Sequence, residues 1–168
     1  DEPFLVLFWD DIIDHEKSAA QQLVETFERK NTPVISTVKV NDKDVSSYGI
    51  IESSTQEWSS FLVDKFLEKP SATETKSRNG VVWKYVLTSD IFQYLEQAES
   101  QRATWEIRLA DAFELMRQKQ DIYGLEIEWK RYDTWSKIGF LEATVNFALK
   151  HDEVKDDFIK LIKSLDIK

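Results

Sequence analysis

Polar and apolar residues alternate between Tyr123 and Tyr132, where the chain reads YGLEIEWKRY. A period of two is typical of a strand that buries one face, because successive side chains point to opposite sides of the backbone. We therefore expect a strand here whose polar face carries Glu126, Glu128 and Lys130. This short stretch holds the highest density of candidate chemistry in the chain.

The N-terminal part of the chain predicts a strand, a helix and a second strand. Residues 4–9 form a continuous apolar run that is long enough for a buried strand and too short for a helix. Apolar residues then recur at helical spacing from 19 to 30, after Asp14 as a helix cap, and residues 34–40 are rich in β-branched side chains. This order predicts a βαβ unit with two parallel, neighbouring strands.

The rest of the chain predicts mostly helices. Ser54 and Glu57 have the spacing of a capping box and precede apolar residues at helical spacing, which predicts a helix over residues 55–67. Residues 70–80 have few apolar side chains and are expected to form a mobile loop. The remaining pattern predicts a strand over 81–87, helices from about 89 and about 105, the strand above, and two final helices.

These elements predict a single mixed α/β domain over residues 1–168. We expect a small, mostly parallel sheet flanked by helices, with a helical C-terminal third. An alternative is a thioredoxin-like core with insertions, because FLVLFW, a helix, VKVN and Tyr48–Ile50 resemble the order of elements in the first half of that fold. The chain has no cysteine, so this resemblance implies a binding module without redox activity.

The net charge of −9 argues against one class of partner. Phosphate backbones attract clustered Lys and Arg, but the cluster Lys130–Arg131 is only two residues long, and Asp133 lies two positions beyond it. We therefore expect no nucleic-acid binding and, if anything, a basic protein partner. No apolar run reaches the roughly 20 residues of a membrane span, and the N-terminus lacks the basic region of a signal peptide. We expect a soluble protein, with the cytoplasm as the default compartment.

The first candidate for chemistry is Glu128-x-Lys130, with Asp121 upstream. This spacing resembles the PD-(D/E)xK nucleases, in which carboxylates hold Mg²⁺ or Mn²⁺ and the lysine lies near the attacking water. The competing interpretation is a solvated ladder of Glu and Lys side chains on a strand surface, which an E-x-K triplet in a chain with 32% charged residues also fits.

The second candidate is a group of carboxylates that could bind a divalent metal. Asp10 and Asp11 follow the first strand, and ligands of α/β sheets bind at such strand ends. Glu126 and Glu128 are further candidate ligands. No glycine-rich phosphate loop follows any predicted strand, and the alternative is that the two aspartates simply begin a loop.

The absence of a recognisable nucleophile or cofactor loop leads to a non-enzymatic protein–protein interaction or regulatory domain as our principal hypothesis. A divalent-metal-dependent, nuclease-like enzyme and an acidic immunity or inhibitor protein are the alternatives. Five of the six tryptophans fall on apolar stripes or strand faces, which predicts core packing for them. The predicted interface consists of Glu126, Glu128, Lys130, Tyr132 and Trp135.

Overall fold

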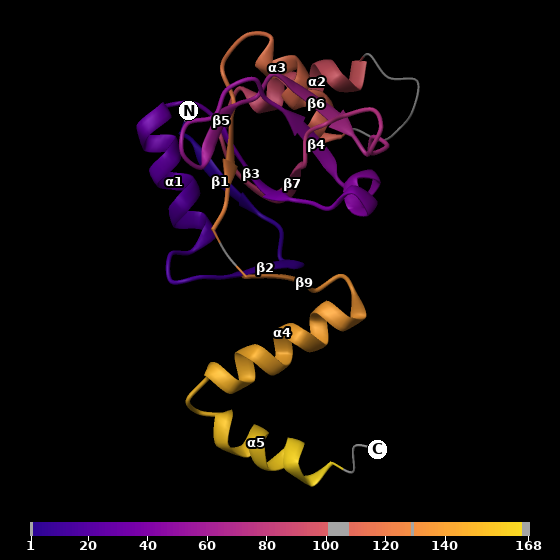
Figure 1. Cartoon of the computed structure of the whole chain (residues 1–168). Coiled ribbons are helices and arrows are strands. Elements are labelled where there is room, and N and C mark those ends of the chain that lie inside the picture. Colours follow the sequence, from indigo (N-terminus) through magenta and orange to yellow (C-terminus); the bar gives the residue numbers. More distant parts are fainter. Residues whose placement is uncertain (1, 101–107, 129, 166–168) are drawn as a thin grey trace. The chain divides into compact units, whose positions relative to one another are not determined.

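The computed structural model describes residues 2–100, 108–128 and 130–165 (Figure 1). Its internal contacts divide the chain into two compact units. The first unit comprises residues 1–8 and 15–128, and the second unit comprises residues 9–14 and 129–168. The expectation of one domain over the whole chain, and that of a mobile loop over residues 70–80, stay predictions.

A seven-stranded mixed sheet forms the centre of the first unit. The strand order is β5-β8-β3-β7-β4-β6, and β1 also pairs with β7. These strands are β1 (Phe4–Leu7), β3 (Val34–Lys39), β4 (Gly49–Glu52), β5 (Ser60–Leu62), β6 (Lys65–Glu68), β7 (Asn79–Leu87) and β8 (Tyr123–Glu126).

Strand β7 organises this sheet because it is long enough to pair with three others. One of its edges pairs with β3 along most of its length, from Val34↔Val86 to Lys39↔Asn79. The other edge is shared, since β1 pairs with residues 84–87 and β4 pairs with residues 79–80. The two partners thus leave the middle of β7 uncovered along that edge, and this fork creates the pocket described below.

The prediction of a mixed α/β fold with a helical C-terminal third is confirmed, whereas the predicted pairing of its first strands is wrong. Strands β1 and β3 are not neighbours, because β7 lies between them and is antiparallel to both. Among the described strands, β3 with β8 is the parallel pair, so the sheet is not mostly parallel. Local patterns identify strands, but the partner of β1 comes from a segment about 80 residues away.

Helices cover both faces of the sheet in the first unit. Helices α2 (Ile91–Ser100) and α3 (Leu109–Arg117) pack on a core that includes Ile35, Tyr85 and Phe113. Helix α1 (Ala19–Lys30) contacts β3, β7 and β8, and a short 3₁₀ helix covers Asp42–Ser47. The Ser18 hydroxyl, rather than Asp14, caps α1 by accepting from the Gln21 amide.

The helix predicted over residues 55–67 does not form. Phe61 and Val63 are buried while Leu62 between them and Asp64 after them are more exposed, which is the period of a strand. Strand β5 pairs with β8, and β6 pairs with β4, so backbone partners distant in sequence satisfy this segment's hydrogen bonds. The Glu57 backbone bonds to Ser60 instead of closing a capping box.

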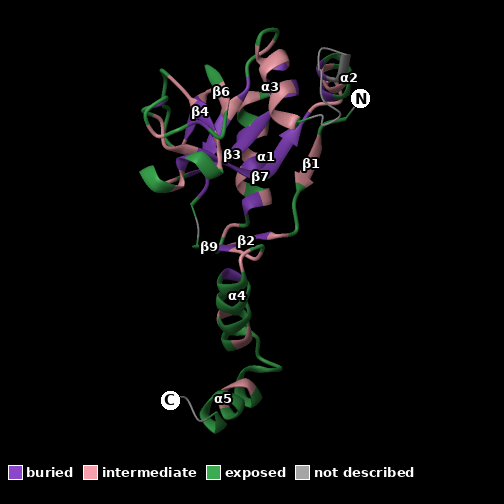
Figure 2. Ribbon diagram, turned by 90° about the vertical axis from the view of Figure 1, so that its right-hand side faces the viewer, coloured by how far each residue is buried: buried purple, intermediate pink, exposed green. Residues whose placement is uncertain are grey.

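The second unit consists of a two-stranded sheet and two helices. Strand β2 (Asp11–Asp14) pairs antiparallel with β9 (Lys130–Asp133). A turn precedes β2, and another turn follows β9. Helix α4 (Lys137–Lys150) packs on β9 through the Tyr132–Phe147 ring pair, and α5 (Lys155–Ser164) contacts α4. Figure 2 shows that both helices are largely exposed. Within the described residues, no helix combines the length and apolar character that crossing a membrane requires.

The predicted core packing of the tryptophans is wrong wherever it is tested. Trp58 and Trp83, both assigned to the core, are exposed in the structure, as is Trp135. Trp105 and Trp129 lie outside the described residues. The core uses Tyr, Phe and aliphatic side chains instead.

Candidate functional site

A hollow of about 530 Å³ lies at the fork where β1 and β4 leave the middle of β7. Phe8, just after β1, and Gly49, at the start of β4, mark its two sides, and the Phe8 amide donates to the Trp83 carbonyl. Its volume is in the range of sites for small molecules. The other residues that line it include Phe66, Glu68, Lys69, Val81, Trp83, Tyr85, Leu95, Arg108, Leu109 and Phe113.

Three charged residues from two separate elements line this hollow. Glu68 and Lys69 lie at the end of β6, and Arg108 is the residue before the first turn of α3. Lys69 has a φ of 46°, in the left-handed region that a residue with a side chain rarely adopts, and its amide donates to the Tyr48 carbonyl. Such strained positions cluster at ligand sites. The hollow therefore combines an apolar floor with both signs of charge, as expected for a polar ligand that carries phosphate.

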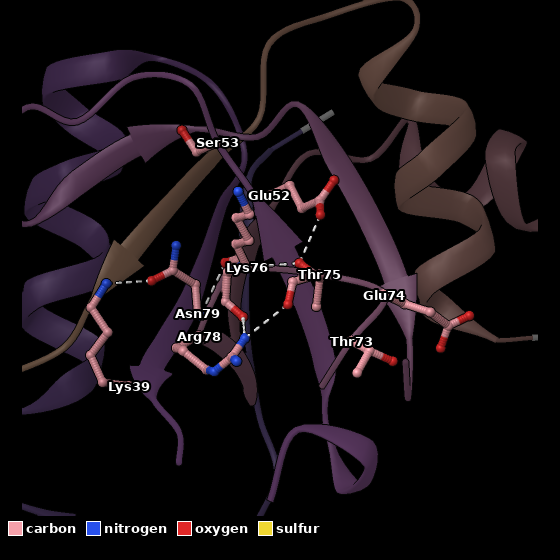
Figure 3. A pocket seen from close by; sticks show the side chains of 10 residues that line it. Lys39, Glu52, Ser53, Thr73, Glu74, Thr75, Lys76, Arg78 and Asn79 are labelled. Atoms are coloured by element: carbon pink, nitrogen blue, oxygen red, sulfur yellow. Dashed lines mark hydrogen bonds between the residues drawn. The ribbon is translucent and has the colours of Figure 1, made fainter. Parts of the chain in front are cut away.

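A second hollow, of about 780 Å³, is formed by polar residues of segment 73–79 with Lys39, Glu52 and Ser53 (Figure 3). Its polar groups mostly bind one another. The buried Thr75 hydroxyl donates to Glu52 Oε1, and the Arg78 guanidinium donates to the Thr75 and Ser77 carbonyls and to Asp42 Oδ1. These contacts fix the conformation of the segment, so we assign this hollow a structural role.

The second unit carries the aspartates that follow β1 in the sequence. Asp11 is buried, and its Oδ1 accepts a 2.7 Å hydrogen bond from Arg131 Nε. The backbone carbonyl of Asp10 accepts bonds from the Thr134 amide, at 2.9 Å, and from its hydroxyl, at 2.8 Å. Asp10 Oδ1 is buried, with no hydrogen-bond partner among the described residues. A buried carboxylate oxygen without a donor is costly, and a bound cation would compensate it.

The structure separates the residues of the predicted E-x-K strand. Glu126 and Glu128 belong to the first unit, and Lys130 lies on β9 in the second unit. Glu126 lies 3.4 Å from Lys39 Nζ, and the Glu128 backbone exchanges two hydrogen bonds with the side chain of Gln22. Each glutamate thus has local contacts of its own.

The other predicted site residues also have structural contacts. Lys130 Nζ lies 3.4 Å from Glu142 Oε1 and above the Tyr132 ring, and these two neighbours raise the Lys130 pKa, with Tyr132 the larger cause. Asp121 is exposed and uses its carbonyl to accept from the Thr32 hydroxyl. In the described part of the chain, no three His, Asp or Glu side chains form a metal-binding group. The predicted catalytic, metal and interface roles of all these residues remain untested.

Comparison with known proteins places this fold in a class. A family model described as nucleotidyl transferase matches residues 1–153, and the chain therefore belongs to the nucleotidyl transferase family. Among its relatives is a UTP–glucose-1-phosphate uridylyltransferase of Staphylococcus epidermidis, 40% identical over 166 residues. A second is UTP–glucose-1-phosphate uridylyltransferase 2 of Staphylococcus saprophyticus, 36% identical over 165 residues. The matches cover 99% and 98% of this chain, but only 57% of each relative.

Solved structures agree with this assignment. A UDP-glucose pyrophosphorylase complexed with UDP-glucose superposes with a TM-score of 0.81 at 27% identity, over 89% of this chain and 57% of that one. A UTP-bound enzyme of the same kind from Acinetobacter baumannii gives a TM-score of 0.82 at 25% identity, over 98% and 57% of the two chains. The mixed α/β sheet is thus a nucleotidyl transferase fold and not a thioredoxin-like core.

Membership of this family corrects the functional hypothesis drawn from the sequence. The principal hypothesis of a non-enzymatic interaction domain is wrong, because the family consists of enzymes that transfer nucleotidyl groups. The nuclease-like and immunity-protein alternatives are overturned by the same finding. The expectations of a basic protein partner and of no nucleic-acid binding stay predictions.

The sequence reasoning overlooked Glu68, Lys69 and Arg108. They are far apart along the chain, and no motif links them. No local signal pointed to Lys69 either, because a residue before a proline favours extended backbone, whereas Lys69 has a φ of 46°.

Proposed function

We propose that this chain binds a uridine sugar nucleotide and takes part in the transfer of a uridylyl group from UTP to a sugar 1-phosphate. In that reaction an oxygen of the sugar phosphate attacks the α-phosphorus of UTP. The bond from this phosphorus to the bridging oxygen breaks, and pyrophosphate leaves with its electron pair. The products are UDP-sugar and pyrophosphate. Glucose is the sugar in the names of the relatives.

The hollow at the strand fork is the observation that carries this proposal. Its floor contains the rings of Phe66, Tyr85 and Phe113, which pack on one another and give the hollow an apolar base for a sugar ring. The Glu68 carboxylate would accept hydrogen bonds from sugar hydroxyls, and Lys69 and Arg108 would bind phosphate oxygens. These residues would orient the sugar phosphate for in-line attack, which is the protein's main contribution to phosphoryl-type transfers.

Nucleotidyl transferases usually use Mg²⁺, and Asp10 in the second unit offers one oxygen to such an ion. Asp10 has a buried oxygen without a hydrogen-bond partner among the described residues, while Thr134 holds its backbone in place. Asp10 would therefore bind the ion, and the Asp11–Arg131 pair would keep the adjacent backbone fixed. Such an ion would supply positive charge for phosphate oxygens.

Titration calorimetry of UDP-glucose into the chain, with Mg²⁺ present, tests the proposal. We expect saturable one-site binding to the wild type. Glu68→Gln preserves the shape of the side chain but removes its charge, so binding should weaken about tenfold or more. Glu96→Gln, an exposed site on α2 outside the hollow, is the matched control and should bind as the wild type does.

The same titration distinguishes the hollow from other sites. Equal affinity of Glu68→Gln and the wild type would place the sugar elsewhere. Absence of binding heat in the wild type at millimolar UDP-glucose would contradict the proposal for this chain as a whole.

A further inference from the structure

Trp58 adopts a backbone conformation that suits glycine. Glu57 and Ser60 exchange two backbone hydrogen bonds, of 2.7 and 2.9 Å, so Trp58 and Ser59 form a two-residue hairpin loop. Trp58 has a φ of 57°, and Ser59 is not among the residues with positive φ. This combination is that of a type II′ turn, in which glycine is the preferred first central residue. A bulky residue with positive φ is an outlier, because its Cβ crowds the following carbonyl.

The other described tryptophans are also unusually exposed to solvent for this residue type. The exposed fractions are 81% for Trp9, 93% for Trp58, 44% for Trp83 and 80% for Trp135. Tryptophan is highly buried on average, and the tyrosines and phenylalanines of the core show that large aromatic side chains can be buried here. Trp9 and Trp135 lie in turns next to Asp10 and Ser136, where small, flexible residues are favoured.

Trp83 lies inside a strand, and its position also suits glycine. It belongs to β7 and lines the hollow at the strand fork, where its ring contacts Phe8 at a centroid distance of 5.6 Å. Glycine inside a strand often marks a place where a ligand approaches the backbone closely. A residue without a side chain at position 83 would enlarge this hollow.

The composition of the whole chain points the same way. The chain has four glycines and six tryptophans. Average glycine usage of about 7% would give roughly 12 glycines in a chain of this length, so glycine is clearly depleted. The two residue types together come close to that number. Some codons are translated as tryptophan under one genetic code and as glycine under another. Such a codon would put tryptophan at glycine positions throughout the chain.

We propose that the fold requires glycine at position 58, and that the tryptophans at 9, 83 and 135 also stand at glycine positions in the protein as its own cell makes it. Position 58 carries the strongest geometric argument. The four positions share exposed side chains and places in turns or beside a ligand-sized hollow.

Thermal unfolding of three variants tests the geometric part. Trp58→Gly should raise Tm by about 2–4 °C, because it relieves the left-handed strain and its exposed side chain loses little packing. Trp58→Ala keeps a Cβ and should leave Tm within about 1 °C of the wild type. Ser59→Gly is the matched control in the same loop and should lower Tm slightly, because it only adds backbone freedom.

Peptide mass spectrometry of the protein from the cells that naturally produce it tests the rest. Peptides that span positions 9, 58, 83 and 135 should have the masses of glycine-containing sequences. Tryptophan masses in these peptides would overturn the proposal. A Trp58→Gly variant that melts at or below the wild-type temperature would overturn it as well. So would equal effects of Trp58→Gly and Trp58→Ala, which would show that the side chain matters and the φ angle does not.

Discussion

Arg131 Nε donates a 2.7 Å hydrogen bond to Asp11 Oδ1 across the β2–β9 pair, and this ion pair is shielded from solvent. Only 2% of the Asp11 side chain and 13% of the Arg131 side chain are exposed. Removing one charge of a buried pair leaves the other poorly compensated. We therefore predict that Arg131→Met lowers the free energy of unfolding by about 3 kcal/mol, measured by urea denaturation.

A more exposed ion pair in the same unit supplies the comparison for this prediction. Lys150 pairs with Asp14, and 58% of the Lys150 side chain is exposed. Lys150→Met should therefore cost less than about 1 kcal/mol. Similar losses for the two variants would show that burial does not strengthen the Asp11–Arg131 pair.

Gly124 and Phe61 are directly opposite each other in the β8–β5 pair, and the ring occupies the place of a side chain on Gly124. A Cβ at position 124 would lie 2.2 Å from Phe61 Cε2, and the buried ring has little room to move. Gly124→Ala should therefore destabilise the chain by about 1–3 kcal/mol in urea denaturation.

Gly49 provides the control for the substitution at Gly124. A Cβ at position 49 would have a nearest neighbour at 3.5 Å, which is an ordinary contact. Gly49→Ala should change the free energy of unfolding by no more than about 1 kcal/mol. A mild Gly124→Ala variant would mean that Phe61 can leave its place over Gly124.

The Lys30–Glu57 ion pair predicts a pH-dependent contribution to stability. The hydrogen bond from Lys30 lowers the Glu57 pKa, and the same bond raises the Lys30 pKa. Stability from Glu57 is present above its unfolded pKa of about 4.3 and is lost as the pH falls through the lower folded pKa. Stability from Lys30 is present below its unfolded pKa and is lost as the pH rises through its higher folded pKa. Both contributions are therefore present at pH 7.

Melting temperatures as a function of pH test this window. Glu57→Gln should melt below the wild type at pH 7, and the difference should shrink as the pH falls through the lowered folded pKa of Glu57. Lys30→Met should show the same pattern. A difference for Glu57→Gln that persists unchanged at low pH would indicate a cause other than the ion pair.

Sequence patterns predicted those elements whose apolar spacing fits only one kind of structure. Helix α1 and strand β7 form close to where periodicity placed them. The segment 55–67 was misassigned because its apolar spacing fits either structure, and pairing of β5 with the distant β8 decided the outcome. The neighbours of β1 could not be predicted for the same reason, since β7 lies about 80 residues away.

The site was less predictable than the fold. The hollow draws its charged residues from the ends of β6 and the start of α3, and no spacing rule connects Glu68 with Arg108. The sequence did identify Asp10 and Asp11 as candidate metal ligands, because paired carboxylates after a buried strand fit a metal site. The alternative of an ordinary loop could not be rejected without knowing that Asp10 Oδ1 is buried without a hydrogen-bond partner among the described residues.

Asp10 should reduce stability while it supports function. Its buried oxygen lacks a donor in the described part of the chain, so replacing the charge with a neutral amide should cost nothing in the absence of metal. We predict that Asp10→Asn raises Tm in a chelator-containing buffer. We also predict that Mg²⁺ raises the Tm of the wild type but not that of the variant.

Calorimetric titration of UDP-glucose into the wild type and Glu68→Gln tests the central claim most directly. The account predicts saturable binding to the wild type and binding at least about tenfold weaker to Glu68→Gln. Equal affinity of the two proteins, or no binding of UDP-glucose by the wild type, would contradict it.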